Sequence, residues 1–354
     1  MMIEYKKGNL LQDNAEAFVN TVNTVGVMGK GIALQFKQAY PENYRIYEKA
    51  CRAKKFNIGD VLTVPLGMVN PKYIINFPTK QHWREKSKMK YIETGLQALV
   101  KEVKSLGIQS IAIPPLGCGN GGLNWEEVRP KIENAFEELP DVHVRLYLPT
   151  GSPDPDKLKI GTKKPDLTDS RALLIALLDH YSIPGYTLTL LEIQKLAYFL
   201  QETGQPLKLN YKRYYHGPYA ENLNFVLQKL EGHYIRGYGD RNRDAQIYLL
   251  PDSVKEAREF LANKDEALRR LDRVSEVIRG FETPYGMELL GTVHWVMKEK
   301  PSISNNVDEV IKEVQEWSPY KKRTLKENHI RKAWQHLEKQ SMIPIPRNVN
   351  APTT

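Results

Sequence analysis

The sequence contains only two cysteines, Cys51 and Cys118, among its 354 residues. Two thiols cannot form the disulfide framework of a small secreted protein, and no cysteine or histidine spacing resembles a zinc site. No apolar run approaches the ~18 residues of a membrane span, and the first residues lack the apolar core of a secretory signal. These absences predict a metal-free protein of the cytoplasm with no membrane partner.

Positive charge is in excess, with 51 Lys and Arg residues against 42 Asp and Glu residues, or a net charge of +9. Such an excess weakly favours an anionic partner, such as nucleic acid or a nucleotide. The stretch 72–90 alone holds six basic residues and one acidic residue. A nucleic-acid contact is therefore expected first in that stretch.

The length predicts about two domains. Residues 1–150 alternate strand and helix patterns, which is typical of a layered α/β domain. Residues 151–168 are rich in Pro, Gly and charge, as in a linker. Residues 169–342 show helical stripes and two strand-like stretches, which predicts a helix-rich α+β domain with a small sheet. Residues 343–354 are expected to form a disordered tail.

The periodicity of apolar residues predicts the individual elements. In the first domain we expect strands at 3–6, 18–23, 61–66, 73–77, 110–114 and 142–148, and helices at 32–40, 41–51, 91–106 and 125–139. In the second domain we expect helices at 172–181, 190–203, 219–231, 254–261, 266–280, 285–300, 307–317 and 328–339, and strands at 208–215 and 245–250.

Two glycine-rich segments, 26–31 and 117–122, each follow a predicted buried strand and precede a helix. Glycines let backbone N–H groups approach a phosphate, and the N-terminus of the next helix adds partial positive charge. Asn124 is a suitable N-cap for the second of these helices. One such loop alone often only turns the chain, and the spacing is not that of a P-loop. Two of them at strand ends predict a diphosphate site.

A third segment, 76–84, also follows a strand and contains Lys80, Trp83 and Arg84. On spacing alone, Lys80 and Arg84 are typical of solvated surface charges, and Trp83 is typical of an aromatic residue in the core or at its edge. A catalytic role for Lys80 does not follow from this pattern by itself.

Five motifs occur in order along the first 150 residues, and together they resemble the macrodomain family. More closely, they are similar to its DarG antitoxin branch, and the resemblance covers about residues 2–150. The motifs are GNL at 8–10, VNTVN at 19–23, GVMGKGIA at 26–33, NFPTK at 76–80 and PPLGCGNGGLNW at 114–125. A macrodomain followed by a helix-rich domain is also the layout of that branch.

The resemblance implies a mixed sheet in an αβα sandwich that binds ADP-ribose in a crevice. It implies an antitoxin that hydrolyses ADP-ribose from thymidine bases of single-stranded DNA. The expected partners are ADP-ribose, ADP-ribosylated single-stranded DNA and the DarT toxin, an ADP-ribosyltransferase that the C-terminal domain binds and neutralises. No cofactor is expected, because ADP-ribose is part of the substrate. The alternative is a catalytically inactive ADP-ribose reader fused to a toxin-inhibiting domain.

The resemblance also implies site residues. Lys80 and Asn23 are expected at the scissile bond, and Asn9 and Leu10 at the adenine, where an Asn oxygen can accept from the amine. The expected ADP-ribose ligands are Gly8, Asn9, Leu10, Asn20, Asn23, Gly29, Lys30, Gly31, Ile32, Thr79, Pro115, Leu116, Gly117, Cys118, Gly119, Asn120 and Gly121.

Two mechanisms for Lys80 stay open. Lysine-dependent relatives pair the lysine with an aspartate that aligns with Gly121, so this chain lacks that carboxylate. In the first mechanism, the Lys80 ammonium stabilises or protonates the departing thymine. In the second, the Lys80 amine attacks C1″ of an opened ribose and forms a Schiff base.

Basic residues interleaved with an aromatic suit a single strand, through phosphate neutralisation and stacking. We therefore expect DNA contacts from Lys80, His82, Trp83, Arg84, Lys86 and Lys88, although a solvated basic loop would look the same. Glu309, Glu313 and Glu316 fall on one face of a predicted helix. These carboxylates are a hypothetical toxin contact in which they replace DNA phosphates, and a solvated helix face is the alternative.

Overall fold

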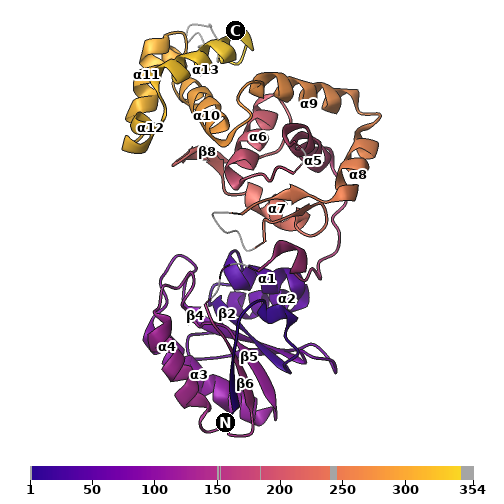
Figure 1. Cartoon of the computed structure of the whole chain (residues 1–354), viewed down its shortest axis with the longest axis vertical. Coiled ribbons are helices and arrows are strands. Elements are labelled where there is room, and N and C mark those ends of the chain that lie inside the picture. The colour runs from indigo at the N-terminus through magenta and orange to yellow at the C-terminus, as the bar shows by residue number, and fades with distance from the viewer. Residues whose placement is uncertain (1, 150, 152, 184, 240–244, 344–354) are drawn as a thin grey trace, which may run out of the picture. The chain divides into compact units, whose positions relative to one another are not determined.

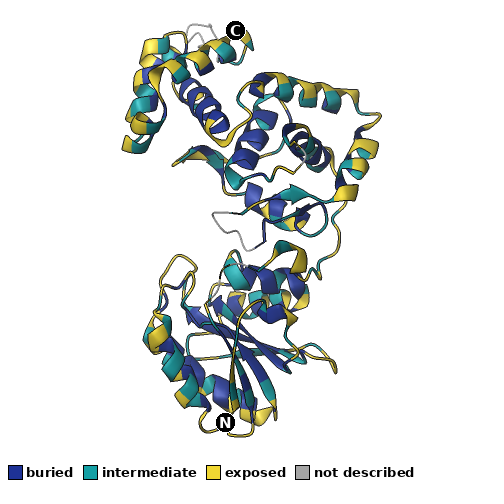
Figure 2. Cartoon of the chain, in the orientation of Figure 1, coloured by how far each residue is buried: buried dark blue, intermediate teal, exposed yellow. Residues whose placement is uncertain are grey.

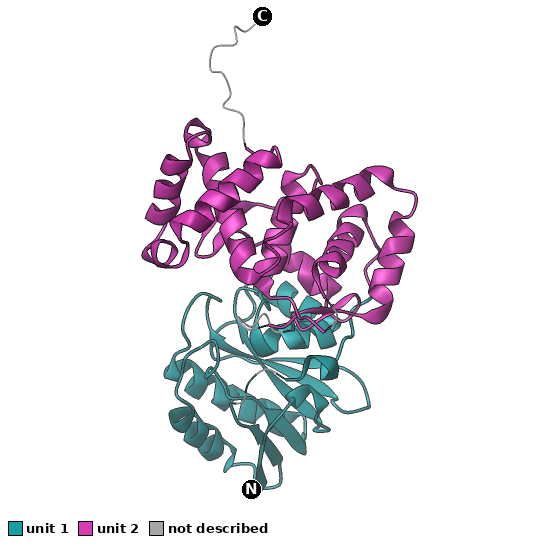
Figure 3. Cartoon of the chain, turned by 45° about the horizontal axis from the view of Figure 1, so that its top comes forward, with its two compact units in different colours: residues 1–163, 239–242 teal, residues 164–238, 243–354 magenta. Residues whose placement is uncertain are grey.

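The structure is a computed structural model that describes residues 2–149, 151, 153–183, 185–239 and 245–343 (Figure 1). The chain divides into two compact units (Figure 3). The first comprises residues 1–163 with 239–242, and the second comprises residues 164–238 with 243–354.

The first unit is built on a six-stranded sheet in the order β1-β6-β5-β2-β4-β3. Neighbouring strands are parallel except β3 and β4, which are antiparallel. The sheet is therefore mixed, as predicted. Its strands are β1 (Met2–Lys6), β2 (Ala17–Asn23), β3 (Leu62–Pro65), β4 (Tyr73–Lys80), β5 (Ser110–Ile113) and β6 (His143–Tyr147).

Both faces of this sheet are covered by helices. Side chains alternate along a strand, so Val19 of β2 packs in the core beneath α3 and α4, whereas Phe18 packs on the opposite face with α1. Burial on both faces explains the apolar runs in the central strands, most of whose residues are buried (Figure 2). The helical elements are η1 (Leu10–Gln12), α1 (Gly31–Ala39), α2 (Pro41–Arg52), α3 (Met89–Ser105), α4 (Trp125–Phe136) and η2 (Pro155–Lys157).

Short sequence signals determine where helices α2 and α4 begin, as expected. Pro41 begins α2 at a position where its missing N–H is not needed. The Asn124 side chain accepts a hydrogen bond from the Glu126 N–H and caps α4, which confirms the predicted N-cap. In α3, a Cβ on Gly95 would lie 2.4 Å from the Phe77 ring, so only glycine lets this helix approach β4.

The second unit is helix-rich, as predicted, with two separate two-stranded pairs. Strand β7 (Tyr211–Tyr214) pairs with β8 (Gly217–Ala220), and β9 (Ile235–Arg236) pairs with β10 (Tyr248–Leu249). The helices are α5 (Asp169–Tyr181), α6 (Leu190–Glu202), α7 (Leu223–Leu230), α8 (Pro251–Leu261), α9 (Asp265–Ile278), α10 (Pro284–Glu299), η3 (Pro301–Ile303), α11 (Val307–Glu316), α12 (Pro319–Thr324) and α13 (Glu327–Lys339).

Three details of this unit differ from the sequence prediction. The helix expected at 219–231 begins only at Leu223, because a tight turn at Gly217 (φ +94°) starts β8. The two predicted strands do not pair with each other, since each finds a different partner. The short helix α12 was not predicted; the Ser318 side chain caps it and Pro319 begins it. The predicted tail lies outside the described residues from 344 onward.

A buried carboxylate ties the chain between β1 and β2 to the sheet. The Asp13 carboxylate accepts hydrogen bonds from the Tyr147 hydroxyl (2.7 Å), the Ala15 N–H (2.9 Å) and Arg145, and Lys6 lies 3.2 Å away. Burial alone would raise the pKa of Asp13, but these hydrogen bonds outweigh it and lower the pKa to about 2.

The Asp13→Asn variant tests this anchor. A carboxyl group with a lowered folded-state pKa stabilises the fold above its unfolded value and loses that contribution as pH falls through its folded value. We expect the variant to be less stable than the wild type by about 2 kcal/mol at pH 7. The deficit should shrink as the pH falls from about 4 to about 2, as measured by urea unfolding. Asp141→Asn, at an exposed turn, is the control; a pH-independent deficit for Asp13→Asn would contradict the argument.

Candidate active site

Three loops meet where β2, β4 and β5 end. Ligands of such sheets bind outside the carboxyl ends of parallel strands. We define loop 1 as residues 24–30, the lysine loop as residues 81–88 and loop 2 as residues 114–124. The Thr24 N–H and hydroxyl both donate to the Gln81 carbonyl at 3.1 Å, which joins loop 1 to the lysine loop. The Ser87 N–H donates to the Gly121 carbonyl at 3.0 Å, which joins the lysine loop to loop 2.

Asn23, at the end of β2, organises loop 1. Its side-chain oxygen accepts from the N–H groups of Val25 (3.1 Å) and Val27 (3.3 Å), and its amide nitrogen donates to the Val27 carbonyl (2.6 Å). The Tyr47 hydroxyl donates to the Asn23 carbonyl at 2.7 Å. Because the Asn23 amide is occupied within the protein, the structure shows it holding loop 1, and its catalytic role stays a prediction.

Asn20 was predicted as an ADP-ribose ligand, but it is fully buried. Its amide nitrogen donates to the Asn76 side-chain oxygen at 3.0 Å, and Asn76 in turn donates to Asn43 at 2.7 Å. The structure therefore shows Asn20 in a buried amide network beneath the loops, and its contact with ADP-ribose stays a prediction.

Loop 2 presents backbone donors. Within the described part of the chain, no hydrogen bond uses the N–H groups of Gly119, Asn120 or Gly121. Three consecutive unused donors in a glycine-rich turn suit an anion such as a phosphate. The N-terminus of α1, directly after loop 1, faces this turn, because a Cβ on Gly31 (φ +62°) would lie 2.8 Å from the Asn120 side-chain nitrogen.

Gly121 has no room for a side chain. A Cβ there would lie 2.2 Å from both the Gly117 carbonyl oxygen and the Ser87 hydroxyl. The aspartate that the family resemblance aligns with this position therefore cannot be accommodated in loop 2 as it is folded.

Cys118 is half-buried in loop 2, and its thiol contacts the Leu116 carbonyl at 3.5 Å. Burial raises the pKa of Cys118 to about 11. The thiol is therefore protonated at physiological pH.

Lys80 ends β4 and points to loop 2. Its ammonium group donates to the Asn120 carbonyl at 3.1 Å. Burial, and then the positive charge of Lys86, lower the pKa of Lys80. Lys86 itself lies against loop 2, with its ammonium 3.2 Å from a Cβ built on Gly122. A lysine that sheds its proton more easily than usual can act as a proton donor or as an amine nucleophile.

Sequence reasoning missed Ser87. It is 6% exposed, and its hydroxyl has no hydrogen-bond partner within the described residues. The hydroxyl packs beneath Gly117 and Gly121 and supports the turn that holds the free N–H groups. Its position between Lys86 and Lys88 resembles an exposed polar loop, so no sequence signal marks it.

The predicted adenine residues have structural partners of their own. The Asn9 side-chain oxygen accepts from the Leu11 N–H at 3.0 Å and caps η1, and Leu10 is buried. The expected acceptor for the adenine amine is thus engaged by the backbone. Gly8 (φ +105°) is exposed beside them.

The remaining predicted ligands lie at or under the loops. Gly29 and Lys30 precede α1, and Gly31 and Ile32 form its first turn. Thr79 and Leu116 are buried beneath the surface, and Pro115 is half-buried. Among the predicted loop glycines, Gly119 is exposed and Gly29 and Gly31 are half-buried, whereas Gly117 and Gly121 are buried.

The predicted DNA contacts form the exposed lysine loop. The Trp83 side chain is 47% exposed, the Arg84 guanidinium lies 4.6 Å over its ring, and the His82 ring centroid is 5.3 Å away. Lys86 and Lys88 are exposed in the same loop. The structure therefore places an exposed aromatic ring and several cations in the loop that directly follows Lys80.

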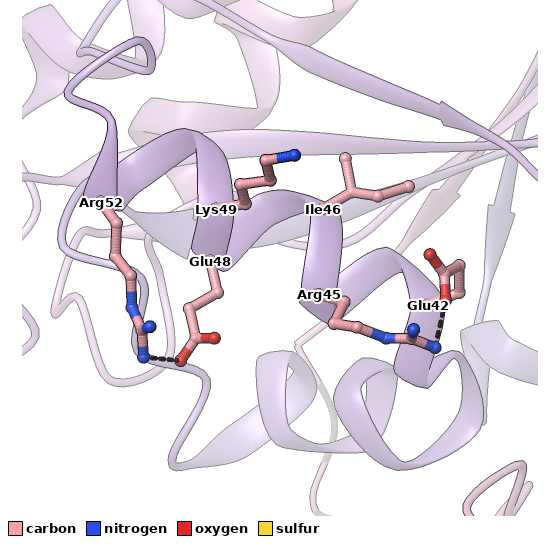
Figure 4. Close-up of a pocket in the computed structure, with 6 residues that line it drawn as sticks. All are labelled: Glu42, Arg45, Ile46, Glu48, Lys49 and Arg52. Atoms are coloured by element: carbon pink, nitrogen blue, oxygen red, sulfur yellow. Dashed lines mark hydrogen bonds and ion pairs between the residues drawn. The ribbon is translucent and has the colours of Figure 1, made fainter.

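A hollow of about 430 Å³ lies elsewhere, on α2 (Figure 4). Its lining comes from one helix, and four of its charged side chains pair as Glu42–Arg45 and Glu48–Arg52. None of the residues predicted from the sequence lines it. Within the described ranges, no three His, Cys, Asp or Glu side chains gather as metal ligands, and no helix is both long and apolar enough to cross a membrane.

Comparison with known proteins shows which family has this arrangement of loops. The Macro domain model matches residues 19–132, which include all three loops. A DNA ADP-ribosyl glycohydrolase of Thermus aquaticus is 47% identical over 343 residues, or 97% of this chain and 94% of that protein. This chain belongs to the DarG family of DNA ADP-ribosyl glycohydrolases. The predicted family and fold class are thereby confirmed.

Two further DarG-family proteins are similar in part. The solved macrodomain of Mycobacterium tuberculosis DarG is 54% identical and covers 42% of this chain and 99% of its own, with a TM-score of 0.42. A DNA ADP-ribosyl transferase–DNA ADP-ribosyl glycohydrolase fusion protein of Thermosipho africanus is 34% identical over 166 residues, or 42% of each chain.

The steric limit in loop 2 is testable with Gly121→Ala. A methyl group at this position must displace the Gly117 carbonyl or Ser87, which would disorder the three N–H donors. We expect ADP-ribose affinity to fall at least tenfold, measured by calorimetry. Gly151→Ala is the control, because nothing lies within 4 Å of a Cβ there. Unchanged affinity in Gly121→Ala would show that this turn does not hold the ligand.

Proposed function

We propose that this chain removes ADP-ribose from thymidine bases of single-stranded DNA in the cytoplasm. The observation that carries the proposal is the contact of Lys80 with loop 2. The only side-chain cation that hydrogen-bonds loop 2 in the described residues lies beside three unused N–H donors. A diphosphate on those donors would bring the attached ribose close to Lys80.

The bond to be broken joins ribose C1″ to a ring nitrogen of thymine. As it breaks, positive charge develops on the ribose and negative charge on the base. The Lys80 ammonium is suited to stabilise or protonate the base, while water adds to C1″ and its proton is released. No carboxylate is required in this step, which agrees with the steric exclusion at Gly121.

A covalent route is the second candidate, and the lowered pKa of Lys80 favours it. Here the neutral amine bonds to C1″ of an opened ribose, the thymine leaves with a proton, and water then hydrolyses the imine. Both routes release ADP-ribose and an intact thymidine. They differ in whether a lysine–ribose bond forms.

The Lys80→Ala variant tests both routes. On an oligonucleotide carrying ADP-ribosylated thymidine, we expect ADP-ribose release to fall by at least a factor of about 100, since general acid or nucleophilic groups contribute at this level. Binding of free ADP-ribose should persist. Lys101→Ala, on the exposed side of α3, is the control.

Full turnover by Lys80→Ala would overturn the assignment of Lys80. A borohydride-stable adduct that forms on the wild type and not on this variant would select the covalent route. Absence of turnover by the wild type, with retained ADP-ribose binding, would support the ADP-ribose reader instead.

We also propose that the lysine loop carries the DNA strand. Base stacking on an aromatic is worth ~1–3 kcal/mol per base, so Trp83→Ala should raise the KM for modified DNA about tenfold. Raising the salt concentration should increase that KM steeply through counterion release. The affinity for free ADP-ribose should change much less, measured in parallel. Equal salt dependence of both would contradict this path.

The second unit is proposed to bind the DarT toxin. A relative in which transferase and glycohydrolase are fused supports a functional pairing of the two activities. The acidic face proposed for this contact is smaller than expected from the sequence. Glu313 is half-buried and pairs with Lys300 at 2.6 Å, which leaves Glu309 and Glu316 exposed on α11.

A further inference from the structure

Two segments of the second unit, 208–216 and 317–326, lie about 100 residues apart in the sequence but touch in space. The Trp317 indole N–H donates to the Tyr214 carbonyl at 3.0 Å. The Tyr215 and Tyr320 rings stack at 4.7 Å, and the Arg213 guanidinium lies 4.2 Å over the Trp317 ring. We call these five residues, Arg213, Tyr214, Tyr215, Trp317 and Tyr320, the aromatic platform.

The platform is exposed where aromatic rings are normally covered. Tyr214 is 61% exposed and Tyr215 is 51% exposed. Adjacent exposed aromatics mark an interaction site more often than a single exposed ring does. Some of their ring surface is therefore available to a ligand.

The surroundings of the platform are basic. The two segments contain seven Lys and Arg residues and no Asp or Glu. Arg213 pairs with Glu299 at 3.2 Å, and Lys321 is buried against Glu288. The other five are exposed and have no acidic partner among the described residues: Lys208, Lys212, Lys322, Arg323 and Lys326.

A buried polar cluster holds the platform in place. Glu288 of α10 binds the Lys321 ammonium at 2.6 Å and the His216 ring at 2.9 Å. Lys321 also donates to the Thr292 hydroxyl at 2.9 Å. One carboxylate thus fixes both the turn after β7 and helix α12. Groups that are held in place before binding lose less entropy when a ligand arrives.

We propose that the aromatic platform binds single-stranded nucleic acid. Unstacked bases would lie on Tyr214 and Tyr215, and the five exposed cations would neutralise phosphates of the same strand. Open rings beside unpaired cations are the combination that a flexible polyanion with planar bases requires. The proposal goes beyond the proposed function, which needs DNA only at the first unit.

The experiment measures binding of an unmodified, fluorescently labelled 20-nucleotide oligothymidine to the full chain by anisotropy. To remove DNA binding by the lysine loop, the parent protein and all variants carry Trp83→Ala and Arg84→Ala. Adding Tyr214→Ala and Tyr215→Ala should weaken binding at least tenfold. Adding Phe225→Ala, a 61% exposed aromatic of α7, should leave binding unchanged.

Charge reversal gives a second readout that leaves the core intact. Lys212→Glu with Lys322→Glu should also weaken binding at least tenfold and reduce its salt dependence. The proposal would be overturned if the Tyr214→Ala and Tyr215→Ala variant bound oligothymidine as well as the Trp83→Ala and Arg84→Ala parent does. It would also be overturned if polyglutamate competed for binding as well as unlabelled oligothymidine does. Loss of toxin binding without loss of oligothymidine binding would assign the platform to a protein partner instead.

These outcomes are independent of the glycohydrolase activity. The oligothymidine carries no ADP-ribose, so its binding is measured without any turnover. If the chain released no ADP-ribose at all, the oligothymidine measurements would still test whether the platform binds single-stranded nucleic acid.

Discussion

The parallel register of β2, β4 and β5 is the constraint on which the candidate site depends. It brings three loops to one edge of the sheet, where Thr24 bonds to Gln81, Ser87 bonds to Gly121 and Lys80 bonds to Asn120. None of these pairs is close in sequence. The cation and the free N–H donors therefore face each other only because three strands point the same way.

Steric exclusion and electrostatics act together at that edge. The turn of loop 2 is so tight that residue 121 can carry no side chain, so this position cannot place a carboxylate beside Lys80. Burial lowers the pKa of Lys80, and the positive charge of Lys86 lowers it further. Within the described part of the chain, Lys80 forms no ion pair with a carboxylate, which suits a leaving group that departs as an anion.

Most of the elements of the first unit could be predicted, because apolar periodicity and glycine-rich breaks are local signals. The strand expected at 73–77 extends to Lys80, since Pro78 and Lys80 continue the pairing with β2. The three asparagines were harder to interpret. Asn9, Asn20 and Asn23 all occur in site motifs, but the partners of their amides come from the backbone or from distant residues. A sequence pattern does not reveal which amides are already satisfied.

The sequence by itself determined the family, the mixed α/β architecture, the glycine-rich loops and the lysine that ends β4, because each is encoded in a short contiguous motif. Tertiary structure alone decided what those motifs touch. It buried Asn20, paired Glu313 with Lys300, left the Ser87 hydroxyl beneath loop 2, and joined Tyr214 to Trp317 across about 100 residues. The physical reason is that burial and hydrogen bonding depend on spatial neighbours, whereas a motif specifies only neighbours along the chain.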